Sequence, residues 1–357
     1  MSGDNSDTDV CWRRRRVTRR RVVSFTGPRS VAVDERPTET VGDDQLRVET
    51  TVSGVSAGTE LLVYRDEVPE EMPVDATLPA FEGASFDYPL AYGYAAVGRV
   101  VETGTDTDDD WLGRRVFGFR PHTETFVAEP SAVVPLPEQL STTAAAMLPT
   151  VETAVTLVLD TAPRLGERVA VFGAGAVGLT TVALLAEYPL GELIVVEPQP
   201  ERRERAAALG ADTTLAPAAT GLGERQVADE EPGLDAAVEI SGNPAALDDA
   251  VAAVGYDGRV TVGSWYGQKR AELNLGGEYH RSRIAIEASQ VSTLDPSLRG
   301  RWTTDRRLQT AVSRAGELPL SELVTHRVPF AEAPRAYDLL DDPDGETPLQ
   351  VVFDYDV

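Results

Sequence analysis

The feature that most constrains the fold is the stretch 168–188, which reads RVAVF, then GAGAVG, then LTTVALLAEY. The first run is typical of a buried strand and the last predicts an amphipathic helix. A strand that enters a helix through a glycine-rich turn is the first half of a β-α-β unit, and strand and helix patterns keep alternating after it. We therefore expect a parallel sheet covered by helices on both faces.

The glycines of this turn have separate expected roles. Gly173 permits the tight turn, Gly175 lets a pyrophosphate approach the backbone, and Gly178 lets the helix pack on the sheet. The helix then begins at Ala176 and Val177, where unpaired N–H groups and the positive end of the helix dipole favour an anion. The stretch predicts a dinucleotide-binding unit.

The next strand, ELIVVEP, ends at Glu197, nineteen residues beyond Gly178. A carboxylate at this place accepts hydrogen bonds from a ribose diol and repels a 2′-phosphate, so it favours NAD over NADP. Arg202 and Arg203 follow closely and are the residues through which a phosphate could still be bound.

Two later strands end in small polar residues. DAAVEI is followed by Ser241, Gly242 and Asn243, and GRVTV is followed by Gly263 and Ser264. Carboxyl ends of parallel strands share one edge of the sheet, where ligands bind. We expect the first group to turn over the cofactor and the second to lie near its nicotinamide half.

The chain before residue 148 has a different texture. Short β-like runs such as LRVETTV, AAVGRVVE and RRVFGF are separated by Gly, Pro and Asp turns, which predicts a barrel-like β domain. A length of 357 residues also favours two domains. Residues 1–21 contain seven arginines from position 13 onward, and a break after them argues against an export signal. We expect a disordered basic leader, with the fold beginning near Val22.

Composition excludes several function classes. A net charge of −25 disfavours nucleic acid, and no apolar run reaches the roughly 18 residues of a membrane span. Lys269 is the only lysine in this acidic chain, which suggests a halophilic cytoplasm. Cys11 is the only cysteine, so an internal disulfide and a cysteine-cluster zinc site are excluded.

The order of these parts resembles the medium-chain dehydrogenase/reductase superfamily, the zinc-type alcohol dehydrogenases. SGVSAGTE, PLAYGYAAVGRVV, RLGERVAVFGAGAVGL, VEISGNPAAL and LVTHRVPF follow that family's order, and SAGTE with YHRSRIAIEASQVS is most similar to the branch of bacteriochlorophyllide a dehydrogenase. The resemblance implies a GroES-like catalytic domain at 22–148, completed by 291–357, and a doubly wound Rossmann domain at 149–290. It implies NAD, a small-molecule substrate bound between the domains, a cytoplasmic location and a homodimer or homotetramer.

The resemblance also implies that zinc has been lost. Ser56 stands where zinc-dependent relatives carry a ligand cysteine, and Tyr94 stands where they carry a ligand histidine. Glu152 falls near the third ligand position of the sorbitol and threonine dehydrogenase branch. One carboxylate without nitrogen or sulfur partners is a poor zinc site, so we expect no metal.

Without zinc, positioned side chains must polarise the substrate oxygen and move its proton. The candidates at matching positions are Ser56, Thr59, Glu60 and Tyr94. Tyr94 is alternatively a packed ring, and Glu60 is alternatively a cap for the helix that LLVY begins, which is the stronger interpretation for this acid.

On the C-terminal side, His280 and Arg281 are candidates for contact with substrate or cofactor phosphate, with a charged surface loop as the alternative. His122, in FRPHTETF, is a weaker candidate.

Three functions fit these motifs. The first is an NAD-dependent oxidoreductase that interconverts a hydroxyl and a carbonyl group without metal. The second is a zinc-independent reductase of activated C=C bonds or quinones, and the third is a non-catalytic NAD-binding sensor or partner subunit. The polar SAGTE turn and the HRSR cluster favour catalysis, because a sensor has no need of a polar cleft.

Overall fold

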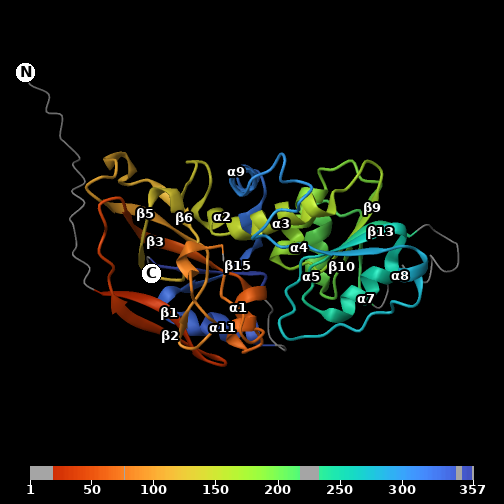
Figure 1. The fold of residues 1–357 in the computed structure, drawn as a ribbon, viewed down its shortest axis with the longest axis horizontal. Coiled ribbons are helices and arrows are strands. Elements are labelled where there is room, and N and C mark those ends of the chain that lie inside the picture. The colour runs from red at the N-terminus through yellow and green to blue at the C-terminus, as the bar shows by residue number, and fades with distance from the viewer. Residues whose placement is uncertain (1–18, 76, 218–232, 343–347, 356–357) are drawn as a thin grey trace, which may run out of the picture.

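A computed structural model describes residues 19–75, 77–217, 233–342 and 348–355. The described chain forms two parts that lie side by side, a β-rich part and a part built on a parallel sheet (Figure 1). This confirms the α/β fold predicted from the sequence.

The parallel sheet has the strand order β11-β10-β9-β12-β13-β14, and neighbouring strands in this order run parallel. It is the order of doubly wound dinucleotide-binding sheets, whose switch point lies between the first and fourth strands, here β9 and β12. The strands are β9 (Arg168–Phe172), β10 (Glu192–Val196), β11 (Thr213–Leu215), β12 (Leu234–Glu239), β13 (Val254–Val262) and β14 (Ala285–Ala288). The helices between them are α4 (Ala176–Leu185), α5 (Pro200–Ala208), α7 (Pro244–Ala253) and α8 (Glu278–Arg281).

The β-rich part joins both ends of the chain. Its larger sheet has the order β15-β16-β3-β5-β6-β8, with β7 also paired to β3, and its smaller sheet has the order β2-β1-β4. The strands are β1 (Arg19–Gly27), β2 (Ser30–Pro37), β3 (Leu46–Val55), β4 (Leu90–Ala91), β5 (Ala96–Thr103), β6 (Arg115–Gly118), β7 (Thr125–Ala128), β8 (Val134–Pro135), β15 (Val324–Pro329) and β16 (Gln350–Asp354). Helices α1 (Ala57–Tyr64) and α11 (Ala333–Asp341) pack together beside them. Because β16 lies antiparallel to β3, the C-terminal segment completes the N-terminal part.

The predicted leader needs a correction at its boundary. Strand β1 begins at Arg19 and pairs with β2 from Arg19 onward, so the last three residues of the expected leader belong to the sheet. Arg21 also forms an ion pair with Glu124. The rest of the predicted leader, residues 1–18, lies outside the described residues.

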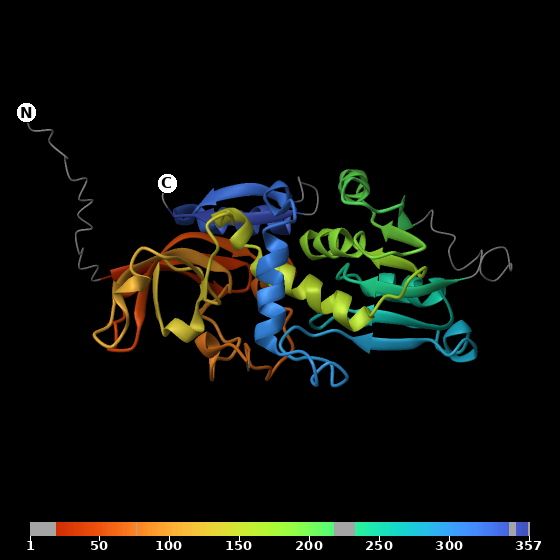
Figure 2. The ribbon, with the colours of Figure 1, turned by 90° about the horizontal axis from the view of Figure 1, so that it is seen from above.

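Two helices lie where the parts meet. Helix α3 (Leu148–Thr161) packs against both α4 and α9 (Thr304–Ala315), and α9 crosses it between the two parts (Figure 2). Most of α3 is buried, including Leu148, Val151 and Leu157, and it belongs to the largest apolar cluster of the described chain. None of the helices in the described ranges combines the length and apolarity that crossing a bilayer demands.

Candidate active site

In the glycine turn between β9 and α4, two glycines are packed closely against other atoms and one faces open space. Gly173 has φ +105°, and a Cβ there would lie 2.7 Å from Ser241 Cα. A Cβ on Gly178 would lie 2.0 Å from the carbonyl oxygen of Gly173. Gly175, the N-cap of α4, has φ −73°, and a Cβ there would meet no atom within 4 Å. The fold itself therefore needs the outer glycines, while the space above Gly175 fits a bound pyrophosphate.

Glu197 follows β10 beside this turn and is 4% exposed. Its Oε2 accepts the N–H of Ala174 at 2.8 Å and its Oε1 accepts the N–H of Gln199 at 3.0 Å. Each carboxylate oxygen keeps further lone pairs for a ribose hydroxyl. Arg203 donates from Nη1 to the carbonyl oxygens of Glu197 and Pro198, both at 2.7 Å, so it is occupied by the main chain.

Arg202 is partly buried on α5 and donates to the carbonyl oxygen of Pro348 at 3.3 Å. Burial lowers the pKa of Arg202, and the charge of nearby Glu197 raises it. The guanidinium of Arg202 therefore lies close to an opposite charge.

The predicted turns after β12 and β13 meet at the carboxyl edge of the sheet. Gly242 donates its N–H to Ser264 Oγ at 2.9 Å. The fully buried Glu239 organises this edge, and no motif in the sequence indicated it. Its carboxylate accepts from the N–H and hydroxyl of Ser241, at 2.8 and 2.5 Å, and from the hydroxyl of Tyr266. Burial and this hydrogen bond raise the pKa of Tyr266.

Gly263 lies at the same edge and faces α3. A Cβ there would lie 2.6 Å from Leu157 Cδ2, so the end of β13 packs closely against the junction helix. The structure thus brings the predicted positions 241, 242, 263 and 264 together with the glycine turn.

The SAGTE turn holds three polar side chains in contact. Ser56 is the N-cap residue of α1, and its side chain makes no cap hydrogen bond. Its Oγ instead accepts from the hydroxyl of Tyr94. The Tyr94 hydroxyl also has a hydrogen bond with Thr59. The structure therefore brings these three predicted candidates together.

Burial, opposed by the hydrogen bonds to Ser56 and Thr59, raises the pKa of Tyr94 to about 12. The phenol is therefore protonated at neutral pH and acts as a hydrogen-bond donor.

Glu60 lies behind this turn and is fully buried. Its Oε1 accepts the N–H of Ser56 at 2.7 Å, which confirms the capping interpretation. Its Oε2 accepts the hydroxyl of Tyr337 at 2.6 Å and lies 3.1 Å from His122 Nε2. Beyond it, Ser53 Oγ lies 2.7 Å from His122 Nδ1. The prediction that Glu60 contacts substrate is thus corrected, because its carboxylate is enclosed by donors and holds the turn in place.

His122 belongs to this support as well. It is fully buried, and its ring lies so close to Gly93 that a Cβ there would be 2.4 Å from Nε2. Gly93 has φ +97° and immediately precedes Tyr94. The imidazole therefore packs beneath the main chain that presents Tyr94. The sequence indicated this role of His122 only by placing a polar residue between two predicted strands.

A small pocket, partly open to solvent, lies next to the Tyr94–Ser56 pair. Its polar lining comes from Ser56, Tyr94, Thr150, Thr153 and Gln350. Its apolar lining includes Pro149, at the start of α3, and Val177, in the first turn after the glycine turn. The pocket therefore extends from the first turn of α4, beside the glycine turn, to the hydroxyl pair.

His280 and Arg281 do not belong to this pocket, which corrects their assignment as catalytic residues. Both are exposed on α8, immediately before β14. Because β14 is parallel to β13, the segment before it lies at the amino edge of the sheet, opposite the glycine turn. Figure 1 shows α8 at the far end of the Rossmann part. The exposed position of both residues agrees with the alternative interpretation, a charged surface segment.

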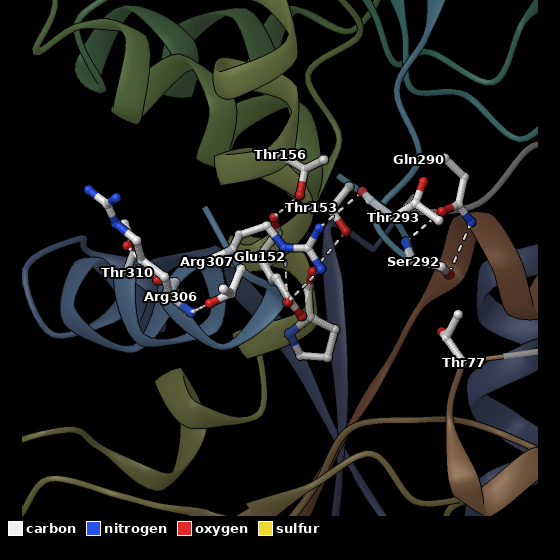
Figure 3. A network of polar contacts seen from close by, with 12 residues as sticks. Thr77, Glu152, Thr153, Thr156, Gln290, Ser292, Thr293, Arg306, Arg307 and Thr310 are labelled. Carbon is white, nitrogen blue, oxygen red and sulfur yellow. Dashed lines mark hydrogen bonds and ion pairs between the residues drawn. The ribbon is translucent and has the colours of Figure 1, made fainter. Parts of the chain in front are cut away.

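Glu152 also points away from the pocket. On α3, its Oε1 accepts from Arg307 Nε and Nη2 at 3.1 and 3.0 Å (Figure 3). Both side chains are less than a tenth exposed, and Arg307 also donates to Thr293. Burial raises the pKa of Glu152, and the guanidinium opposes this. In the described part of the chain, no group of three His, Cys, Asp or Glu side chains could hold a metal ion.

Comparison with known proteins agrees with this geometry. Residues 176–307 match the family model of zinc-binding dehydrogenases. D-guloside 3-dehydrogenase of Escherichia coli K12 is 26% identical over 326 residues, which cover 87% of this chain and 93% of that protein. The 2-desacetyl-2-hydroxyethyl bacteriochlorophyllide A dehydrogenase of Rhodobacter capsulatus is 27% identical over 362 residues, covering 94% and 98%.

A solved structure shares the fold over nearly the whole length. The structure of a short chain alcohol dehydrogenase from Escherichia coli CFT073, complexed with NADH, has a TM-score of 0.76 at 18% identity and covers 95% of this chain and 100% of that one. With the glycine turn, the strand order and the paired parts already described, these likenesses bear out the resemblance found in the sequence. The matches support the medium-chain dehydrogenase/reductase superfamily, with its zinc-type alcohol dehydrogenases, as the group of proteins that this chain resembles.

Proposed function

We propose that this protein is an NAD(H)-dependent oxidoreductase that interconverts a hydroxyl and a carbonyl group without catalytic zinc. The observation that carries the proposal is the pocket, which joins Val177 beside the glycine turn to the Tyr94–Ser56 hydroxyl pair. A hydride and a proton must reach neighbouring atoms of the substrate, and this pocket offers a place for each.

A bound nicotinamide supplies or accepts the hydride. The chain's own part is to hold the substrate oxygen and handle its proton. Ser56 Oγ accepts from Tyr94, which leaves the serine's own proton free for an oxygen in the pocket. Because the pKa of Tyr94 is about 12, its phenol can replace the proton that Ser56 donates to a developing alkoxide. Glu60 fixes the turn through the Ser56 N–H.

The preference for NAD is supported by Glu197 and its neighbours. The carboxylate would repel a 2′-phosphate, and Arg203 is already bound to main-chain carbonyl groups. The related fold from Escherichia coli CFT073 was solved with NADH.

The absence of catalytic zinc is proposed from the donor set. Catalytic zinc sites use cysteine, histidine and carboxylate ligands, usually three. The pocket presents neutral hydroxyl groups from Ser56 and Tyr94, and Glu152 is held by Arg307. Protein purified without added metal should carry far less than one zinc ion per chain by elemental analysis. A stoichiometric zinc ion lost together with activity would overturn this part of the proposal.

The test of the chemistry is Tyr94→Phe, measured by nicotinamide absorbance with a panel of carbonyl compounds and alcohols. Removing one hydroxyl should lower kcat by roughly 10²–10⁴, the range usual for a positioned proton donor, and leave NADH affinity unchanged. Ser56→Ala and Thr59→Val should each cost less.

Tyr88→Phe is the matched control. The pKa of Tyr88 is also raised by burial to about 12, but its hydroxyl donates to the carbonyl oxygen of Val63 outside the pocket lining. If Tyr94→Phe and Tyr88→Phe turn over alike, the hydroxyl pair is not the proton donor. A panel of enones and quinones in the same assay tests the alternative reductase, and faster turnover of these compounds would favour it.

A further inference from the structure

The segment that follows β13 contacts both parts of the molecule. The hydroxyl of Tyr266 donates to Glu239 in the Rossmann part. Two residues later, Gln268 donates its N–H to the carbonyl oxygen of Glu67 in the β-rich part, at 2.9 Å. The main chain that leads into Lys269 is therefore held from both sides, while the side chain of Lys269 is exposed.

Lys269 reaches back to the carboxyl edge of the parallel sheet. Its Nζ donates to the carbonyl oxygen of Gly242 at 3.1 Å. Gly242 follows Ser241, whose Cα lies 2.7 Å from the position that a Cβ on Gly173 would take. The ammonium group thus lies close to the glycine turn, where the open space above Gly175 fits a pyrophosphate.

This contact does not neutralise the charge of Lys269. A carbonyl oxygen has no net charge, and Gly242 uses one of the three donors of the ammonium group. The buried carboxylates of Glu197 and Glu239 lie at the same edge of the sheet and would repel the negative charges of a pyrophosphate. A cation at this edge would offset that repulsion.

We propose that the ammonium group of Lys269 binds the pyrophosphate of the dinucleotide. The inference rests on the cofactor named in the function proposed above. Arg202 and Arg203 follow β10, beside the carboxylate expected to bind the adenosine ribose, whereas Lys269 extends from the segment after β13. A compact charge on a flexible stem can turn from the Gly242 carbonyl to a phosphate oxygen without any shift of the main chain.

The first experiment titrates NADH against the unaltered protein, Lys269→Met and Arg270→Met. Lys269→Met should raise the dissociation constant of NADH roughly 3- to 10-fold, the effect of one solvent-exposed ion pair. The difference should shrink as salt is added, because salt screens exposed charges. Arg270→Met is the matched control, since it removes a positive charge from the next residue, which is also exposed. It should keep the dissociation constant within about twofold of the unaltered value.

Fragments of the cofactor locate the contact. ADP-ribose contains the pyrophosphate and adenosine does not, and the affinity of each is measured by its displacement of NADH. Lys269→Met should weaken ADP-ribose by the same factor as NADH and leave adenosine unchanged. An equal loss for adenosine would place Lys269 against the adenosine half and overturn the proposal.

The second experiment uses the unaltered protein, in which Lys269 is the only lysine. An amine-reactive ester modifies this side chain, and peptide mapping by mass spectrometry gives the rate, with N-acetyl-lysine in the same solution as the reference. At a free NADH concentration about ten times its dissociation constant, about one tenth of the protein remains free, so the modification should slow roughly tenfold. A matching occupancy of adenosine should leave the rate unchanged.

The outcomes separate the two proposals. Equal NADH affinity in the unaltered protein and Lys269→Met, an equal loss in Arg270→Met, or modification that NADH does not slow overturns the role of Lys269 and leaves the proposed function intact. Failure to turn over any ketone or alcohol, with NADH binding weakened in Lys269→Met, overturns the proposed function and leaves the role of Lys269. Failure of the unaltered protein to bind NADH overturns both. The modification experiment decides the question even if Lys269→Met does not fold.

Discussion

Replacing Gly175 with alanine should weaken dinucleotide binding while leaving the fold intact. The added Cβ would meet no protein atom within 4 Å, and the backbone φ of −73° suits any residue. Reduced freedom of the unfolded chain stabilises such a replacement by about 0.4–1 kcal/mol, and loss of a glycine N-cap offsets a few tenths of this. The free energy of unfolding should therefore change by less than about 1 kcal/mol.

The methyl group does enter the space where the pyrophosphate is expected. Overpacking by one methyl group costs about 1–3 kcal/mol, which corresponds to a dissociation constant for NADH raised by roughly 5- to 150-fold. Fluorescence titration with NADH measures the dissociation constant, and a thermal scan of the same sample measures the fold.

Gly178→Ala is the contrasting variant. Its Cβ would lie 2.0 Å from the carbonyl oxygen of Gly173, where contacts of 3.4–4 Å are ordinary, so main chain must shift. We expect the free energy of unfolding to fall by about 1–3 kcal/mol, and Tm to fall by roughly 2–4 °C for each kcal/mol lost. Unchanged NADH affinity in Gly175→Ala would refute the placement of the pyrophosphate. A lowered Tm in Gly175→Ala, or an unchanged one in Gly178→Ala, would refute the packing argument.

Three further predictions address the charges. Glu197→Gln keeps a side-chain oxygen for the main chain but removes the charge. The dissociation constant of NADP(H) divided by that of NAD(H), measured by titration, should therefore fall by roughly tenfold, or about 1.4 kcal/mol. An unchanged ratio would contradict a role of Glu197 in cofactor choice. Because the pKa of Tyr94 is about 12, the rate of carbonyl reduction should vary little between pH 6 and 10. The rate of alcohol oxidation should rise over this range, because the ionised fraction of the phenol increases about tenfold per pH unit. A reduction rate that is halved near pH 7 would point to another acid. Arg307→Met leaves Glu152 buried without its partner and should lower the free energy of unfolding by about 3–5 kcal/mol. The loss should be smaller at pH 5 than at pH 8, because protonation of Glu152 removes the unpaired charge. Denaturant titrations at both pH values measure this difference.

Much of this fold could be predicted from local sequence patterns. The strand, glycine turn and helix at 168–188 are contiguous, so periodicity and turn chemistry indicate them without knowledge of the rest of the chain. Glu197 and the turns at 241 and 263 could be predicted for a related reason, since residues after parallel strands share one edge. The helix cap by Glu60 is also local, four residues from Ser56.

The same edge rule shows why His280 and Arg281 were misplaced. They precede a strand rather than follow one, so the parallel sheet carries them to its amino edge. The sequence motif contained the charges, but the direction of β14 decided where they lie.

Sequence patterns by themselves predicted the parallel sheet and the glycine turn, because each depends on neighbours along the chain. The candidate hydroxyl groups at Ser56 and Tyr94 came from the resemblance to a known family. Only the tertiary structure decided what those groups face. Glu152 meets Arg307 across 155 residues, and Gln350 reaches Val55 across 295. Such contacts form when separate elements pack, and burial then selects the side chains that can satisfy one another. The physical reason is that a hydrogen-bond partner distant in sequence leaves no periodic trace in either segment.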